Sequence, residues 1–196
     1  MPSTDELAKG VVQAVGKTPA EPFMPSTEEL VKAVRAGEKS AFGQLVQLYQ
    51  RAAIITAHSV LRDPERAQDA AQEAFVIAYT KLNQLQAAAA FGPWLLKIVR
   101  RRASLMQRER REERLRSDTV VANFGQTSDW LHRYEEVIEQ LARLPEHERV
   151  VVVLRYVNGH SLQEISGTTG KPVGTIKKQL SRALGRLRKW LREVPS

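Results

Sequence analysis

The chain has 196 residues, enough for one domain of ordinary size or two small ones, and a formal net charge of +8. It contains no cysteine, which excludes disulfides and thiolate metal sites. Its histidines are scattered, and no pair has the spacing of a helical metal site, so we expect neither a metal nor another cofactor. They are His58, His132, His147 and His160.

The sequence also argues against secretion and membrane insertion. The N-terminus carries Asp5 and Glu6 and has no long apolar run, unlike a signal peptide. The apolar run from Val150 to Leu154 is far shorter than the ~20 residues that span a bilayer. We therefore expect a soluble, cytoplasmic protein.

Residues 1–25 hold four prolines and are expected to form a flexible leader. Its first residues, MPSTDEL, recur as MPSTEEL from Met24 to Leu30. Either Met24 is the true start or the segment is a local duplication. The second copy has the features of a helix start, with Ser26 or Thr27 as the cap and acids in the first turn.

The remaining chain has the apolar spacing of helices and no long alternating pattern typical of strands. Val150–Val153 is β-branched, but Pro145 and the acids after it favour a helix there. Residues 120–127 break the pattern and are expected to be a linker. We predict an all-α fold with two small helical domains joined by a flexible linker, the C-terminal one a helix-turn-helix. Helices are predicted over residues 27–36, 39–61, 64–85, 89–116, 128–144, 145–157, 161–168 and 173–193.

The predicted helix over residues 64–85 has two different faces. One repeats small or aliphatic residues every three or four positions and should be buried: Ala67, Ala71, Ala74, Ala78, Leu82 and Leu85. The outward face carries Asp69, Gln72, Glu73, Val76 and Thr80. Periodicity alone fits an ordinary solvated surface as well as a contact surface.

The next predicted helix combines an apolar stripe with strong positive charge. The stripe includes Phe91, Trp94, Leu95 and Ile98, while Lys97 to Arg116 holds nine basic and three acidic residues. An aromatic residue beside a basic helix suits melted DNA, where bases stack and phosphates are neutralised. The alternative is that Phe91 and Trp94 are core residues.

The string SLQEISGTTGKPVGTIKKQLSRALGRLRKW, from Ser161 to Trp190, is typical of a helix-turn-helix. Gly170 stands where a tight turn needs positive φ, and Ile176 is the expected apolar anchor of the second helix. From Lys171 to Arg192 there are eight Lys or Arg and no Asp or Glu. A helix of this kind can enter the DNA major groove.

The second helix also divides into faces. Its apolar residues repeat at helical spacing and are expected to face the core: Val173, Ile176, Leu180, Leu184, Leu187 and Leu191. The residues left facing outward are Thr175, Lys178, Gln179, Arg182 and Arg186. Those near the N-terminus of such a helix reach base edges, and later ones meet phosphates.

The positive charge is concentrated in these two segments. Lys97–Arg116 carries +6 and Lys171–Arg192 carries +8, or +14 together against +8 for the whole chain, so the remaining residues carry −6. Two basic footprints on an acidic background indicate two contact sites for a polyanion, most simply nucleic acid. The alternative for each is a solvated helix face.

Taken in order, these segments resemble a sigma factor of the sigma-70 family, of the small extracytoplasmic-function (ECF) type. LVQLYQRAAIITAHSVLRDPERAQDAAQEAFVIAYTKL resembles the family's first helices and core-binding helix, and AFGPWLLKIVRRRASLMQRERR resembles its promoter-melting helix. LPEHERVVVVLRYVNGHSLQEI and PVGTIKKQLSRALGRLR resemble its C-terminal promoter-reading domain. The resemblance covers about residues 27–191.

The resemblance implies a division of the chain. A leader over residues 1–25 precedes a region 2-like helical domain over 26–116, which would bind core RNA polymerase and the −10 promoter element. A linker over 117–129 leads to a region 4-like helix-turn-helix domain over 130–196, which would read the −35 element. The protein would direct promoter-specific transcription initiation and not be an enzyme. Its implied partners are bacterial core RNA polymerase, promoter DNA and an anti-sigma factor.

The resemblance also implies site residues. Core-polymerase contacts fall on Asp69, Gln72 and Glu73. Contacts to the −10 element fall on Phe91, Trp94, Lys97, Arg100, Arg101 and Arg108. Contacts to the −35 element fall on Thr175, Lys177, Lys178, Gln179, Ser181 and Arg182.

Some positions depart from the family's pattern. Arg101 and Leu105 stand where members often carry Asn and Asp, and alanines fill the loop over residues 87–90, where polar residues are common. Lys171 replaces a usual apolar residue, and Gln179 replaces a common Arg. These departures concern which bases are read, while the role of the helices is unaffected.

Three other interpretations remain open. A stand-alone helix-turn-helix regulator that never touches polymerase would explain Ser161–Trp190 but not Lys97–Arg116. An enzyme acting on nucleic acid would need clustered carboxylates or histidines, and none has metal-binding spacing. A protein that sequesters a sigma inhibitor would keep the fold and lose promoter activity, which the departures at Arg101 and Leu105 allow.

Overall fold

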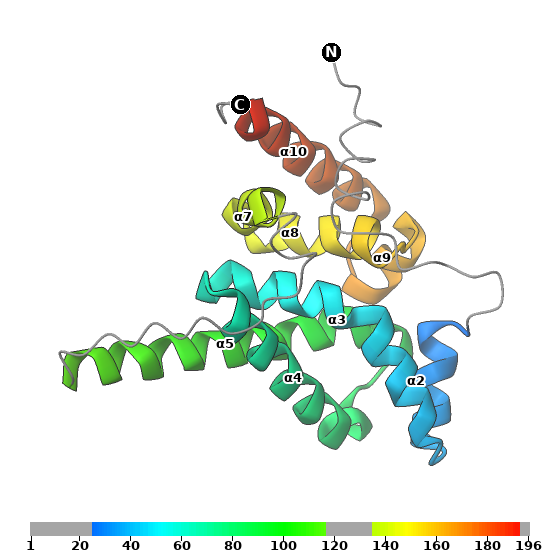
Figure 1. The fold of residues 1–196 in the computed structure, drawn as a ribbon. Coiled ribbons are helices and arrows are strands. Elements are labelled where there is room, and N and C mark those ends of the chain that lie inside the picture. Colours follow the sequence, from blue (N-terminus) through cyan, green and yellow to red (C-terminus); the bar gives the residue numbers. More distant parts are fainter. Residues whose placement is uncertain (1–24, 117–134, 193–196) are drawn as a thin grey trace.

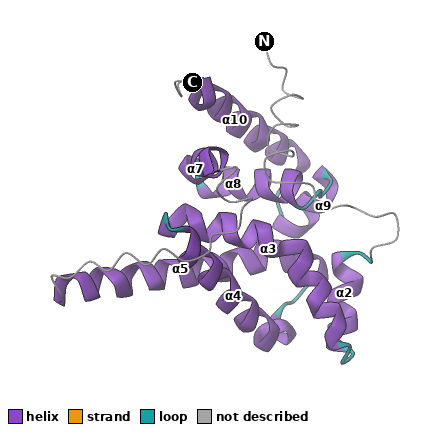
Figure 2. Ribbon diagram, in the orientation of Figure 1, coloured by secondary structure: helices purple, strands orange, loops and turns teal. Residues whose placement is uncertain are grey.

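The computed structural model describes residues 25–116 and 135–192, and within these ranges every regular element is a helix (Figure 2). The N-terminal lobe contains α2 (Thr27–Arg35), α3 (Lys39–Leu61), α4 (Pro64–Lys81), η1 (Leu82–Gln84), η2 (Ala88–Ala90) and α5 (Phe91–Arg116). The C-terminal lobe contains α7 (Glu135–Arg143), α8 (Glu146–Val152), η3 (Val153–Val157), α9 (Leu162–Thr169) and α10 (Val173–Arg192). The prediction of an all-α chain is confirmed. Nearly all of the predicted leader, the linker over residues 117–129 and the start of the helix predicted at 128 lie outside the described residues.

In the N-terminal lobe, α4 and α5 both pack on α3 (Figure 1). The predicted small face of α4 is buried, and Ala67, Ala74 and Ala78 have no exposed surface. Alanine side chains allow the helix axes to approach closely. The Asp63 carboxylate accepts a hydrogen bond from the Arg66 N–H at 3.2 Å, and Pro64 begins the helix, so this end of α4 is fixed by its own sequence.

The prediction of a single helix over residues 64–85 is wrong at the C-terminal end of that range. α4 stops at Lys81 and continues as one 3₁₀ turn, because the Leu82 N–H donates to the Tyr79 carbonyl, three residues back. The guanidinium of Arg35 donates to the Leu82 carbonyl at 3.0 Å and also to the Leu85 carbonyl. Leu82 and Leu85 remain buried as expected, so the apolar pattern is correct even though the backbone form is not.

The helix-turn-helix has the local features expected from the sequence. Ser161 and Glu164 form a capping box that starts α9, with hydrogen bonds of 2.6 and 3.1 Å. Gly170 ends α9 at φ 68°, the left-handed conformation required for the turn. The Ser166 hydroxyl donates to the Lys171 carbonyl at 2.6 Å and ties the turn to α9.

The buried face of α10 is close to the prediction. Ile176, Leu180, Leu184 and Leu187 are buried, whereas Val173 at the first turn is only half-buried. The guanidinium of Arg143 on α7 lies 4.6 Å from the centre of the Trp190 ring, which holds the far end of α10 on the lobe.

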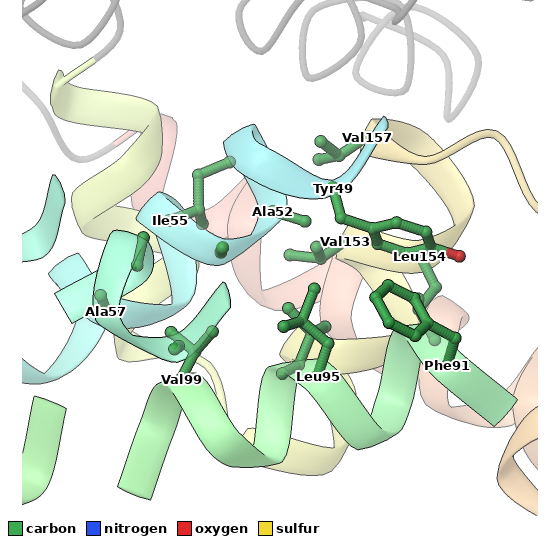
Figure 3. Packing of buried hydrophobic residues seen from close by; sticks show 14 of the residues in the cluster. Tyr49, Ala52, Ile55, Ala57, Phe91, Leu95, Val99, Val153, Leu154 and Val157 are labelled. Atoms are coloured by element: carbon green, nitrogen blue, oxygen red, sulfur yellow. The ribbon is translucent and has the colours of Figure 1, made fainter. Parts of the chain in front are cut away.

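The α8–η3 segment of the C-terminal lobe lies where the two lobes meet. Its residues from Val151 to Leu154 are all buried, and η3 is a single π-helical turn rather than the plain helix predicted to Val157. Four consecutive buried residues cover most of a helix circumference, so the segment needs neighbours on all sides. α10 packs on α8, and α3 and α9 pack on η3. Figure 3 shows Phe91 and Leu95 of α5 beside Leu154 and Val153, and all of these residues belong to one apolar cluster.

Two glycines of the helix-turn-helix offer a matched stability test. Gly170→Ala places a side chain at φ 68° and should destabilise the fold by roughly 1–2 kcal/mol. Gly185→Ala adds a methyl group in open space on helix α10 and should stabilise it by about 0.5–1 kcal/mol. Thermal unfolding followed by circular dichroism should therefore show melting temperatures that shift in opposite directions. Melting temperatures that shift in the same direction in both variants would contradict the left-handed conformation of Gly170.

Candidate functional site

The outward face of α4 is an exposed surface of mixed chemistry. Asp69, Gln72 and Glu73 are all exposed, as the sequence predicts for a contact surface. Beside them Val76 is 65% exposed and Tyr79 is 42% exposed, which makes them two of the three large apolar side chains left open among the described residues. Acidic groups around exposed apolar ones form the pattern of a protein-binding surface.

Glu73 is held by a residue that the sequence analysis did not single out. The Arg102 guanidinium on α5 donates to both carboxylate oxygens of Glu73, one of them at 3.3 Å, and to Glu109 at 3.3 Å. The hydrogen bond to Glu73 raises the pKa of Arg102. This bridge connects the α4 surface to the basic helix, and only the fold reveals it, because the partners are 29 positions apart.

Helix α5 presents a basic stripe to solvent. Lys97, Arg101 and Arg108 are exposed, and Leu105 between them is 43% exposed. They follow one another at three- or four-residue spacing and so share one side of the helix. Other basic residues of α5 serve the fold: Arg110 lies 3.7 Å from the Asp63 carboxylate.

The two aromatic residues of α5 lie in or near the core. Phe91 has no exposed surface and packs edge-on against Tyr49 with ring centroids 5.3 Å apart. Trp94 is half-buried, and its ring centroid lies 6.1 Å from that of Phe91. This placement corrects the expectation that Phe91 contacts DNA, because a ring without exposed surface offers no face to a base. The core interpretation of Phe91 holds instead.

Arg100 also has a role beyond the predicted one. Its guanidinium forms an ion pair with the Glu146 carboxylate on α8, in the other lobe. Both side chains are partly open to solvent, at 42% and 47%. Arg100 is therefore engaged between the lobes in this structure, unlike Lys97 and Arg101.

The N-terminal half of α10 forms the second basic surface. Thr175, Lys177, Lys178, Ser181 and Arg182 are exposed. Gln179 is half-buried, and its side-chain carbonyl oxygen is buried without a hydrogen bond from the described residues. The fold therefore brings together five of the six predicted residues as a solvent-facing group and turns the sixth partly inward.

Further along α10, Arg186 has a structural contact. Its Nε lies 3.3 Å from Oε2 of Glu148, whose side chain is only 2% exposed. This ion pair joins α10 to α8, so the positive charge of Arg186 is partly offset within the lobe. Lys177, Lys178 and Arg182, nearer the start of α10, form no such ion pair with the residues that the structure describes.

The described parts of the chain contain no cluster of three or more His, Asp or Glu residues placed to hold a metal ion. Over residues 25–116 and 135–192, no helix combines the length and apolar character that crossing a membrane requires. The exposed charged surfaces described above, the acidic–apolar face of α4 and the basic faces of α5 and α10, are the candidate surfaces.

Comparison with family models matches two regions in order along the chain. The model for sigma-70 region 2 matches residues 45–113, which span most of α3, α4 and most of α5. The model for sigma-70 region 4 matches residues 134–187, which include α7 to α9 and most of α10. Each lobe thus corresponds to one region.

Individual relatives agree with the family models. RNA polymerase sigma-H factor from Pseudomonas aeruginosa is 31% identical over 171 residues, covering 80% of this chain and 89% of that protein. ECF RNA polymerase sigma factor SigW from Bacillus subtilis is 27% identical over 179 residues, covering 84% and 96%. The solved structure of CnrH in complex with the cytosolic domain of CnrY aligns over 86% of this chain and 99% of that one, with a TM-score of 0.56 and 24% identity, which shows the shared fold.

The two matched regions follow one another in the order of the two lobes, and each contains one of the basic surfaces described above. The relatives span most of the chain. The chain therefore belongs to the sigma-70 family of RNA polymerase sigma factors, in its extracytoplasmic-function group.

Proposed function

We propose that this sigma factor docks on bacterial core RNA polymerase through the α4 face and reads promoters with two helices, α5 for the −10 element and α10 for the −35 element. The observation that carries this assignment is the pair of solvent-facing basic stripes on separate lobes, each inside a matched sigma region. In this proposal residues 26–116 serve polymerase and the −10 element, and residues 130–196 serve the −35 element. The protein acts as an initiation factor in the cytoplasm, without enzymatic activity of its own.

The α4 face has the composition needed to bind a protein rather than DNA. Asp69 and Glu73 repel phosphates and complement a basic partner, which favours the correct orientation of docking. Val76 and Tyr79 supply apolar surface that becomes buried at the centre of an interface. A stand-alone regulator would have no use for this combination.

The α5 stripe supports contact with the −10 element. Lys97, Arg101 and Arg108 are free to neutralise phosphates along one side of the helix. Trp94 is the aromatic residue with some open surface, and Arg100 becomes available once its ion pair with Glu146 is released. Phe91 stabilises the start of α5 from inside the core and is not part of this surface.

The α10 stripe supports reading of an intact duplex. Thr175, Lys178 and Arg182 are spaced so that they share one face near the start of the second helix of a helix-turn-helix, where side chains reach base edges. Two modest contacts on one polypeptide then act together, because polymerase fixes the spacing of the two readers. We also propose an anti-sigma factor that covers the polymerase-binding surfaces, by family analogy.

Replacing Lys178 and Arg182 together by alanine should weaken −35-dependent transcription by at least about tenfold, because two major-groove or phosphate contacts are lost. Run-off transcription with core polymerase measures the loss. Binding to core polymerase should not change. If both cations contact phosphates, the slope of log K against log salt should fall by about 2.

The matched control is Lys32→Ala with Lys39→Ala, which removes two exposed lysines from α2 and α3 in the other lobe. It lowers the net charge equally and should leave transcription unchanged. Equal losses in both double variants would show that net charge, and not the α10 surface, sets promoter affinity.

Replacing Asp69 by arginine and Gln72 by alanine should weaken binding to core polymerase by at least about tenfold, because the variant puts a like charge against a basic partner. Neither residue takes part in the Arg102 bridge, so the fold of the lobe is retained. Titration of labelled protein with core polymerase gives the affinity. Glu139→Arg, an exposed acid on α7, is the control for charge reversal. Unchanged polymerase binding in the α4 variant would refute the docking assignment.

A further inference from the structure

The second helix of the helix-turn-helix is anchored to its own lobe near the C-terminal end. α7 and α8 both pack on α10 (Figure 1). Arg186 of α10 pairs with Glu148 of α8, and one turn later the Trp190 ring lies 4.6 Å from the guanidinium of Arg143 on α7. The later turns of α10 are therefore held from below, while its early turns present the basic surface.

Glu148 is the acidic residue among the described ones whose side chain is buried, with 2% exposed. Burying a carboxylate costs free energy unless a positive group or hydrogen bonds replace its lost hydration. Nε of Arg186 lies 3.3 Å from Oε2, and Nε2 of His147 lies farther away, 3.9 Å from Oε1. Oε2 accepts no hydrogen bond from the described residues, so the ion pair with Arg186 is the contact that compensates this oxygen.

The Arg186 side chain can contact Glu148 and still bind another group. Its side chain is 51% exposed although Nε lies beside a buried carboxylate. A guanidinium carries several N–H donors in one plane, and Nε–H is only one of them. The terminal nitrogens carry the rest, and they suit a phosphate, because guanidinium and phosphate pair through two parallel hydrogen bonds.

Arg186 also continues the proposed reading face of α10. In a regular helix Arg182 and Arg186 each lie within about 20° of Thr175 around the axis, and all three side chains are exposed. Arg186 lies about 12 Å beyond Lys178 along the axis, close to the width of the major groove. With the early turns of α10 in the groove, Arg186 reaches the edge of the groove, where the phosphates of one strand lie.

We propose that Glu148 is a positioning residue for promoter recognition, which holds the Arg186 guanidinium ready to bind a backbone phosphate beside the −35 element. Glu148 itself is buried and out of reach of DNA. This role rests on the proposed function, because it concerns the duplex that α10 reads there. A side chain that is already held by a buried partner loses less conformational freedom on binding. The phosphate contact fixes the position of α10 on the duplex without reading a base.

Electrostatics without positioning predicts the opposite effect of Glu148. A carboxylate near DNA repels phosphates and cancels part of the charge of Arg186, so its removal should tighten binding. A positioning role predicts weaker binding when the carboxylate is removed, because the guanidinium is then no longer held. The sign of the change in DNA affinity therefore separates the two interpretations.

The phosphate contact is tested with the holoenzyme formed from core RNA polymerase and the full chain, on a promoter that this holoenzyme selects from random-sequence DNA. Arg186→Ala should lower promoter affinity by about threefold to tenfold. It should also reduce the slope of log K against log salt by about 1, as expected for the loss of one phosphate contact. Lys39→Ala removes an exposed lysine at the start of α3 and should change neither quantity.

The positioning role is tested by Glu148→Gln, which keeps the size of the side chain and removes its charge. Promoter affinity should fall by about twofold to fivefold, and Arg186→Ala should lower the affinity less in this background than in the unaltered chain. Glu139→Gln removes an exposed charge from α7 and should not weaken binding. Tighter binding by Glu148→Gln would overturn the positioning role, and so would an equal effect of Arg186→Ala in both backgrounds.

Arg186→Lys tests the same role without removing the buried carboxylate, in case circular dichroism shows that Glu148→Gln does not fold. Lysine keeps the charge but has a single nitrogen, which cannot hold Glu148 and pair with a phosphate through a planar fork. Promoter affinity should therefore still fall, and wild-type affinity of this variant would overturn the role of the oriented guanidinium.

The variant with Lys178→Ala and Arg182→Ala separates failure of this role from failure of the proposed function. Loss of promoter binding in that variant, with no loss in Arg186→Ala, would refute the Glu148–Arg186 role alone. Wild-type affinity in both variants, or a holoenzyme that selects no promoter, would refute the reading of the −35 element by α10.

Discussion

The apolar α8–η3 segment has to be buried on every side, and the arrangement of both lobes depends on that requirement. Val151 to Leu154 are buried in succession, so no single neighbouring helix can cover them. The helix-turn-helix contributes α9 and α10, and the N-terminal lobe contributes α3 together with Phe91 and Leu95 at the start of α5 (Figures 1 and 3). Separation of the lobes would therefore expose this apolar surface.

This shared burial bears on the proposed function. The two basic helices proposed as promoter readers, α5 and α10, belong to lobes that share one apolar core. The packing of the two lobes leaves some of the candidate surfaces exposed and covers others. The α4 face and the outer stripe of α5 remain open in this packing, whereas Arg100 and the η2 loop are occupied by the C-terminal lobe.

The bridge between Arg102 and Glu73 adds a connection inside the N-terminal lobe. It links the proposed polymerase surface to α5, the helix proposed to contact the −10 element, through side chains that remain partly exposed. An exposed ion pair contributes little to stability. Its effect is on orientation, since it holds the Glu73 carboxylate in one position on the α4 face.

The sequence predicted the helices and their buried faces well, because helical periodicity, caps and the turn glycine are local properties. The buried alanines of α4, the capping box at Ser161 and the left-handed Gly170 are examples. Contacts between distant residues had no such signal. The Tyr49–His160 and Arg100–Glu146 pairs depend on how the lobes meet, and the burial of Phe91 depends on Tyr49 across from it. An aromatic residue at the start of a basic helix has the same sequence pattern whether its ring packs in the core or contacts DNA.

In the proposed function one chain carries a polymerase-docking surface and two promoter-reading helices. Size-exclusion chromatography of the purified full chain with bacterial core RNA polymerase, free of other sigma factors and at moderate salt, tests it most directly. We predict co-elution as a one-to-one complex. Separate elution of a folded chain that still binds duplex DNA would contradict the claim and identify a stand-alone regulator.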